Sequence, residues 1–395
     1  MRLAAVLCAA ALGIHAQTPA TELERIRTHM MQTLASQPNY TCLETVDRSR
    51  KEKNARAYQP VDTLRMEVGL VNGKEMFGWP GAKQFEDRDI REFIPTGMFG
   101  TGDFALHARS VFGTNAPTFE LGGKSSLAGY QSVRYDFKVK RVQSGFRARV
   151  GDVTLTVGYH GSFDADLQSL DVRRLEIIAD DIPVQLRMSA ISDIMEFKTV
   201  PIGNGDFLLP AESEEIMVDS AGVATRNRLE FTSCRQFTGQ SKVSFDEPAP
   251  SASDAPKPTE AAPVKLPPGL ALQLRFMNEI DLDYAAIGDE IEAELAQDVK
   301  SKGAVILPKG AMASGRISRI ERHLDFNVIG VTFFDVASGN IHAPLELAFE
   351  RSVGIIAPSI RNPALNSPPR PREAVMILQP GHVRVGQGIL MFWRT

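Results

Sequence analysis

The sequence predicts a mainly β protein of the α+β class. We expect a curved antiparallel half-barrel with an N-terminal helix, then a proline-rich linker and a small β-barrel. Apolar and polar residues alternate over most of the chain with the period of half-buried strands. Turn sequences such as Asn-Gly and Pro-Lys-Gly separate these runs. Residues 246–268 contain seven prolines and no aromatic residue, so they divide the chain in two.

The size of the chain agrees with this division. A chain of 395 residues with 43% hydrophobic content is long enough for two ordinary domain cores. We predict a signal peptide at 1–16, a binding module at 17–245, a linker at 246–268 and a barrel module at 269–395. A polyproline-like linker of this length can span about 60–70 Å.

The first sixteen residues have the pattern of a secretory signal peptide. Arg2 precedes an apolar run from Leu3 to Leu12, and Ala16 is a small residue at the expected cleavage point. The alternative, a buried N-terminal helix, lacks a capping residue. Cys8 lies too early in the run for lipid attachment. No later segment approaches the ~20 apolar residues of a membrane span, so we expect a periplasmic or secreted chain without a membrane-spanning segment.

The formal net charge of −4 argues against nucleic acid as the main partner. Residues 134–149 are basic, but they alternate with apolar residues. We interpret them as the solvated face of two strands rather than as an anion site.

Two cysteines, Cys42 and Cys234, remain after removal of the signal peptide. In an oxidising compartment we expect them to form a disulfide, worth about 4–5 kcal/mol in the chain-entropy model. Two buried free thiols are the alternative. A redox site is not indicated, because the chain has no C-x-x-C motif.

The first predicted element is an amphipathic helix over residues 21–36. Thr21 is followed three residues later by Glu24, which is the spacing of a capping box. Pro38 ends the helix. A strand over residues 39–46 follows, as its β-branched and aromatic content indicates. The apolar residues of the helix form one stripe: Leu23, Ile26, Met30 and Leu34.

A β-hairpin is predicted next. Residues 62–71 alternate between apolar and polar side chains, as a strand does. Asn72-Gly73 is a two-residue turn, and residues 74–79 form the second strand of the hairpin. Phe77 and Trp79 are two residues apart and therefore share a strand face. We expect them to contact a ligand on a concave surface, with an ordinary core role as the alternative.

Glycines interrupt the apolar pattern over residues 87–114. Gly97, Gly100 and Gly102 precede a short predicted helix at 103–112, and their spacing matches neither nucleotide-binding fingerprint. We therefore predict a loop and a helix. Further strands are predicted at 133–142, 153–158, 175–178, 184–191, 193–200, 214–218 and 224–231.

This series of elements resembles a known class of envelope proteins. A capped helix leads into a strand and a long antiparallel series, which includes an aromatic and aspartate-rich segment at 159–166 and a Val-Arg-Arg-Leu-Glu segment at 172–176. The pattern is similar to the half-barrel lipoprotein-localisation carriers and envelope-stress sensor domains, although Ala165 stands where those turns often carry a bulky residue. The resemblance implies a curved sheet around a helix, with a concave apolar face that receives acyl chains or a partner's hydrophobic segment.

The second module has the pattern of a small barrel. Residues 287–299 fit both a helix and a strand, and the strands around them favour a strand. The turns at 266–269 and 306–311 resemble those of the C-terminal barrel of type IV secretion channel proteins. Because the chain lacks the membrane helix of those channels, the resemblance implies only the barrel. The other predicted strands are 270–276, 303–310, 311–320, 328–336, 341–349 and 388–393.

The sequence predicts no catalytic residue, no metal site and no cofactor. H-E-x-x-H and G-x-S-x-G motifs are absent. Asp164, Asp166 and Asp171 lack the glycine and glutamate of a calcium loop, so we interpret them as a solvated turn. The histidines after the signal peptide have no metal-ligand spacing: His29, His107, His160, His323, His342 and His382.

Together these observations predict an exported, non-enzymatic bacterial envelope protein. Its first module would bind a hydrophobic ligand or an acylated partner, so the expected partners are a lipid, a lipoprotein or an envelope protein. The alternative is a two-domain adaptor or assembly protein without a small-molecule ligand. An enzyme with a site assembled from distant residues is a third hypothesis.

Overall fold

The computed structural model describes residues 21–71, 73–82, 85, 90–94, 98–127, 130–237, 264–339, 341–354, 365–381 and 383–395. The predicted signal peptide and most of the predicted linker lie outside these described residues. The predicted domain boundaries therefore remain predictions. Of the described helices, none combines the length and the apolar character needed to cross a membrane.

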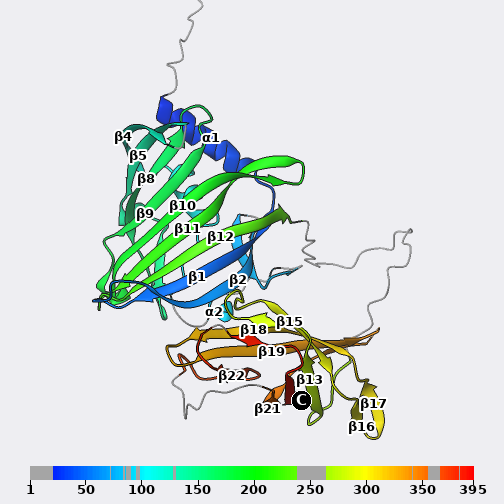
Figure 1. Cartoon of the computed structure of the whole chain (residues 1–395). Coiled ribbons are helices and arrows are strands. Elements are labelled where there is room, and N and C mark those ends of the chain that lie inside the picture. The colour runs from blue at the N-terminus through cyan, green and yellow to red at the C-terminus, as the bar shows by residue number, and fades with distance from the viewer. Residues whose placement is uncertain are drawn as a thin grey trace, which may run out of the picture.

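The first module is built on one curved antiparallel sheet of ten strands, in the order β3-β2-β1-β12-β11-β10-β9-β8-β5-β4 (Figure 1). This arrangement confirms the predicted mainly β, antiparallel fold. A separate hairpin, β6 with β7, lies outside the sheet. The strands are β1 Tyr40–Lys51, β2 Gln59–Val71, β3 Lys74–Gly78, β4 Thr118–Leu127, β5 Tyr130–Val139, β6 Arg147–Val150, β7 Val153–Thr156, β8 Gly158–Asp166, β9 Val172–Asp180, β10 Met188–Ile202, β11 Gly205–Asp219 and β12 Ala224–Gln236.

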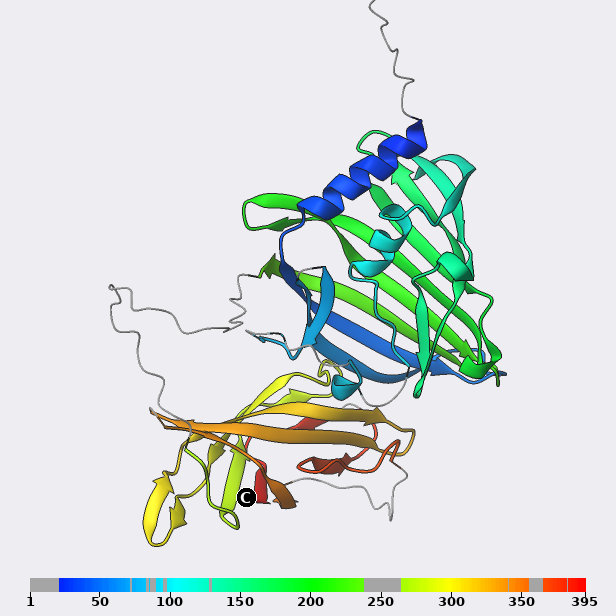
Figure 2. The same ribbon diagram turned by 180° about the vertical axis from the view of Figure 1, so that it is seen from behind.

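Helix α1, Glu22–Ser36, lies against the inner face of this sheet (Figure 2). The predicted capping box is present: the Glu24 backbone N–H donates to the Thr21 hydroxyl at 3.2 Å, and the Thr21 N–H donates to the Glu24 carboxylate at 2.8 Å. Three residues of the predicted apolar stripe, Ile26, Met30 and Leu34, are buried in a cluster that also contains Phe163 and residues of α3, Leu106–Phe112, and the half-buried Leu23 packs against it. A further short helix, α2, spans Ile90–Phe93.

One predicted strand boundary is wrong. The sequence predicts separate strands at 184–191 and 193–200, but Val184–Leu186 is a 3₁₀ turn and β10 runs unbroken from Met188. Arg187, between them, has a left-handed φ of 51°, which an extended strand does not allow. The turn therefore continues to Arg187, three residues after the predicted start of the strand, and β10 begins only at Met188.

The predicted disulfide is present between Cys42 of β1 and Cys234 of β12, which are neighbouring strands. Cys42 is fully buried. The bond joins positions 192 residues apart near the two ends of the first module.

The second module contains an antiparallel sheet of eight strands. Its path β20-β19-β18-β15-β13-β24-β21 is curved, and the terminal strands β20 and β21 are not paired with each other in the described chain. Strand β15 confirms the strand predicted within 287–299. The strands are β13 Ala271–Phe276, β14 Ile280–Asp281, β15 Glu290–Leu295, β16 Val299–Ser301, β17 Ala304–Leu307, β18 Met312–Arg322, β19 Asn327–Ser338, β20 Ile341–Pro344, β21 Ala348–Val353, β22 Ala374–Leu378, β23 Arg384–Val385 and β24 Leu390–Arg394.

The two modules are in direct contact along β2. Only residues 67–71 of this strand pair with β3. Further along β2, the Arg65 N–H donates to the Ile287 carbonyl and the Ile287 N–H donates to the Thr63 carbonyl, both at 2.8 Å. Leu64 and Ile287 form a parallel bridge, and both belong to one apolar cluster that extends through the two modules. Backbone pairing and a common core thus join the modules in addition to the chain between them.

Candidate functional site

The first module contains a cavity of about 600 Å³ against the inner face of the sheet. Strands β3, β10 and β11 supply the sheet side of the cavity. Helix α2, residues 98–101 and the β6–β7 hairpin supply the opposite side. This volume lies in the range of small-molecule binding sites in proteins.

Apolar side chains form much of the cavity wall, and several of them are methionines. They are Phe77, Ile90, Ile94, Met98, Phe99, Phe146, Met188, Ile191 and Met217. Three arginines also line the cavity, namely Arg91, Arg147 and Arg149, and all three are exposed to solvent. The cavity therefore has a largely apolar wall, into which Glu75, His107 and Asp193 are set, and a cationic, solvent-facing part.

A cluster of acidic side chains adjoins this cavity, and two of its members, Glu75 and Asp193, line it. Strand alternation explains three of them, because each takes the place of an apolar residue on an inward strand face. Glu44 follows Tyr40 and Cys42 on β1, Asp193 stands between Ile191 and Met195 on β10, and Glu215 precedes Met217 on β11. All three acids are buried, with exposed fractions of 3%, 5% and 1% respectively.

The loop and helix after β3 complete the cluster. Asp103 lies in the turn before α3 and His107 lies four residues later in the first turn of the helix, and both are buried. Glu75 of β3 accepts hydrogen bonds from the backbone N–H groups of Ala105 at 2.8 Å and Leu106 at 3.2 Å. These bonds fix the start of α3 against the sheet.

Neutral donors satisfy part of this cluster. The Ser213 hydroxyl donates to Asp103 Oδ2. Glu215 Oε2 accepts from the Asn227 amide at 2.9 Å and from the Gly100 N–H at 3.0 Å. Among the described residues, no lysine or arginine forms an ion pair with Glu44, Glu75, Asp103, Asp193 or Glu215, so the cluster has no built-in cation other than a protonated His107.

Burial raises the pKa of these carboxyl groups because it disfavours their charged form. It raises the pKa of Asp103 to about 7 and that of Glu215 to about 8. The pKa values of Glu44 and Asp193 are also well above the ordinary range, first through burial and then through neighbouring carboxylates. Burial lowers the pKa of His107 to about 4, so its imidazole is neutral at pH 7.

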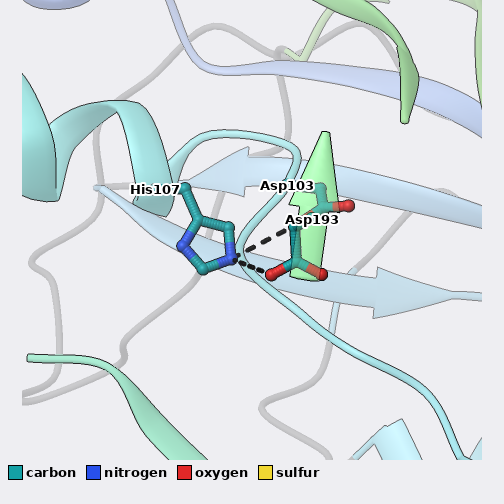
Figure 3. Close-up of side chains that lie close together, drawn as sticks. All are labelled: Asp103, His107 and Asp193. Carbon is teal, nitrogen blue, oxygen red and sulfur yellow. Dashed lines mark ion pairs between the residues drawn. The ribbon is translucent and has the colours of Figure 1, made fainter. Parts of the chain in front are cut away.

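Three of these groups converge on one point (Figure 3). His107 Nε2 lies 3.4 Å from Asp103 Oδ1 and 3.5 Å from Asp193 Oδ2. One ligand atom from each residue lies within 4.8 Å of the other two. A neutral imidazole and two carboxylates are groups that bind divalent cations.

The two predicted ligand-contact residues have different surroundings. Phe77 is buried and lines the cavity. Trp79 follows the end of β3 and is not among the residues that line the cavity; its ring packs 5.2 Å from that of Phe93, and the Arg316 guanidinium of the second module lies 4.7 Å above it. Ligand contact by both residues remains a prediction.

The sequence interpretation did not identify the acidic cluster. A usable signal was present, because Glu44, Asp193 and Glu215 interrupt inward-facing apolar registers, where a carboxylate is costly without a partner. The four-residue spacing of Asp103 and His107 was a second signal. This spacing alone did not indicate a site, because the third residue of the group, Asp193, lies on a strand far along the chain.

No family model matches the chain, and no curated protein matches it. Two solved structures show a low similarity of fold to this chain. A domain assigned to outer membrane lipoprotein sorting from Vibrio parahaemolyticus is 12% identical, with a TM-score of 0.32, over 55% of this chain and 93% of that one. A DUF1329 family protein from Desulfovibrio piger is 10% identical, with a TM-score of 0.30, over 56% of this chain and 95% of that one. Similarity at this level carries no functional inference. Neither structure is a type IV secretion channel protein, so the resemblance of the second module to that family gains no support from them.

Proposed function

We propose that the chain is an exported, non-enzymatic envelope protein whose first module binds the apolar part of a lipid or an acylated partner. The observation that carries this proposal is the cavity of about 600 Å³ on the inner face of the curved sheet. Its apolar wall removes a hydrocarbon chain from water, which is the main source of free energy for such binding.

The composition of the cavity favours a flexible apolar ligand. Met98, Met188 and Met217 line it, and methionine side chains adapt to irregular apolar shapes because they are unbranched and polarizable. Arg147 and Arg149 lie at the solvent-exposed part of the same cavity. An amphiphile with an anionic head group would place its head near these arginines and its chain inside.

The location outside the cytoplasm has two lines of support. Residues 1–16 have the pattern of a signal peptide. The Cys42–Cys234 disulfide fits an oxidising compartment such as the periplasm or the cell exterior.

A binding experiment tests the proposed function. We expect protein purified from its own host to carry a lipid that native mass spectrometry detects. We also expect the lipid-free protein to bind a fluorescent acyl-chain probe, which added lipid then displaces. The Ile191→Trp variant fills the cavity from β10 and should weaken probe binding about 10-fold or more. Leu121→Trp, at a site that is 61% exposed on β4, is the matched control and should bind as the wild type does.

Circular dichroism of both variants checks that the fold is retained. Absence of lipid in the native protein together with absence of probe binding would contradict the proposal. Recovery of a stoichiometric protein partner without lipid would instead support the alternative, an adaptor or assembly protein.

A further inference from the structure

The acidic cluster has a feature that hydrocarbon binding does not explain. A wall that contacts only an acyl chain needs no ionisable groups, yet His107 and Asp193 line the cavity and Asp103 lies directly behind them. Burying carboxylates without a cation is unfavourable, and proteins usually retain such groups where they bind something.

The distances among the three groups fit a metal ion. Zinc binds imidazole nitrogen and carboxylate oxygen at about 2.0–2.2 Å, so two ligand atoms of a tetrahedral site are about 3.3–3.6 Å apart. His107 Nε2 is 3.4 Å from Asp103 Oδ1 and 3.5 Å from Asp193 Oδ2. Both separations from His107 therefore match those of ligands around one ion, and the ligand atoms of Asp103 and Asp193 lie within 4.8 Å of each other. Figure 3 shows the two carboxylates on the same side of the imidazole.

The surroundings hold these groups in place. The Ser213 hydroxyl donates to Asp103 Oδ2, which leaves Oδ1 directed at His107 without a hydrogen-bond donor in the described chain. The His107 ring packs edge-on against Phe146, with ring centroids 5.4 Å apart. Such second-layer contacts orient metal ligands in known sites.

Glu44 gives an independent indication of a missing cation. Its side chain is 3% exposed, and Oε2 has no hydrogen-bond partner among the described residues. After burial itself, the neighbouring carboxylates of Glu75, Glu215 and Asp103 raise its pKa, so Glu44 belongs to the same cluster. A buried acceptor without a donor costs free energy, which a nearby divalent cation would offset.

We propose that Asp103, His107 and Asp193 bind a divalent transition-metal cation, with Zn²⁺ as the best match. One imidazole and two carboxylates suit zinc better than calcium or magnesium, which prefer sets of oxygen ligands. His107 and Asp193 both line the cavity, which would give the ion a route of entry. This site is independent of whether the cavity holds an acyl chain.

The test uses the full chain without an affinity tag, stripped with a chelator and titrated with Zn²⁺ by calorimetry at pH 7. We expect one Zn²⁺ per chain. His107→Ala should weaken binding at least about 100-fold, because it removes a direct ligand. His160→Ala is the matched control: His160 also pairs with an aspartate, Asp180 at 2.9 Å, but its side chain is 45% exposed, so this variant should bind Zn²⁺ as the wild type does.

Asp193→Asn provides a second variant that keeps the side-chain shape, in case His107→Ala does not fold. Titration with Co²⁺ gives a further readout, since its visible absorption reports tetrahedral coordination and should be lost in both site variants. Wild-type protein that takes up no Zn²⁺ from micromolar solution would overturn the proposal. So would folded His107→Ala and Asp193→Asn proteins with unchanged affinity. Acyl-probe binding, measured separately, distinguishes failure here from failure of the proposed function.

Discussion

The two modules bury acidic side chains in opposite ways. In the second module, Arg319 lies between Glu373 and Glu321, at 3.0 Å and 2.6 Å, and its guanidinium also donates to the carbonyls of Ser367 and Pro368. Burial alone would raise the pKa of Glu373, but hydrogen bonds from Arg319, from the backbone and from Ser318 outweigh it, and the pKa lies below the ordinary range. This network is complete within the chain.

The acidic cluster of the first module is buried to a similar degree, and its carboxyl pKa values move the other way. Burial raises the pKa of Glu215 to about 8, with Asp103 adding to the shift, and no described arginine or lysine opposes it. The difference shows that burial does not decide the charge state of a carboxyl group. The presence of a cation does, and among the described residues of the first module no lysine or arginine supplies one.

The largest expected effect is in the second module. Arg319→Met leaves Glu321 and Glu373 buried without their cation, and we expect a loss of about 3–5 kcal/mol in the free energy of unfolding, measured with urea. The control is Arg228→Ala, whose exposed pair with Glu214 should contribute under about 1 kcal/mol. Equal effects from the two substitutions would show that the Arg319 network is not the stabilising feature.

The next effect is a pH dependence in the first module. The pKa of Glu215 is raised from 4.5 to about 8, so the folded state binds more protons than the unfolded state between these values. This contribution to stability is fully present below about pH 4.5 and is lost as the pH rises to about 8. In a metal chelator, we expect the free energy of unfolding to fall by about 2 kcal/mol or more from pH 5 to pH 8.5. A stability that rises over this interval would contradict the assignment.

Glu215→Gln should remove part of that dependence. The amide stays neutral at every pH, so in a chelator the variant should be about 1–2 kcal/mol more stable than the wild type at pH 8.5, with little difference at pH 5. Glu230→Gln, an exposed position on β12, should change stability by no more than about 0.5 kcal/mol at either pH. Loss of stability in Glu215→Gln at pH 8.5 would indicate that its carboxylate is compensated in the folded protein.

A pair of serine substitutions gives the smallest and sharpest comparison. Ser213 donates to Asp103 in the first module, and Ser318 donates to Glu373 at 2.9 Å in the second. Each change to alanine should lower the free energy of unfolding by about 1 kcal/mol. For Ser213→Ala the cost should grow from pH 5 to pH 8.5, because the lost bond favours the charged form of Asp103. For Ser318→Ala it should stay constant, since Glu373 is ionised throughout. The same pH dependence in both would remove the distinction between the clusters.

Local signals in the sequence predicted much of the fold. The Thr21 and Glu24 spacing predicted the start of α1, the alternation before Gly73 predicted the β2–β3 hairpin, and strand neighbours resolved the ambiguity at β15. The disulfide followed from the number of cysteines and the compartment. Each of these depends on residues close in sequence or on composition, which a single chain reveals directly.

The candidate site was largely not predicted, because its geometry depends on strand order. His107 meets Asp193 only because α3 packs on the inner face of β10, and no spacing in the sequence contains that information. Strand β4 was missed as well, since Gly122 and Gly123 dilute its apolar alternation and cause a register shift in its pairing with β5. Arg187 took the left-handed conformation where the pattern predicted a continuous strand.

The pairing of Ile287 with Thr63 and Arg65 also covers an open edge of a β-sheet. A fragment truncated before the second module would leave these backbone groups and Leu64 facing water. Uncovered sheet edges pair with one another between molecules. The second module thus protects the first from self-association, and a shortened chain is expected to aggregate even where each part can form its own strands.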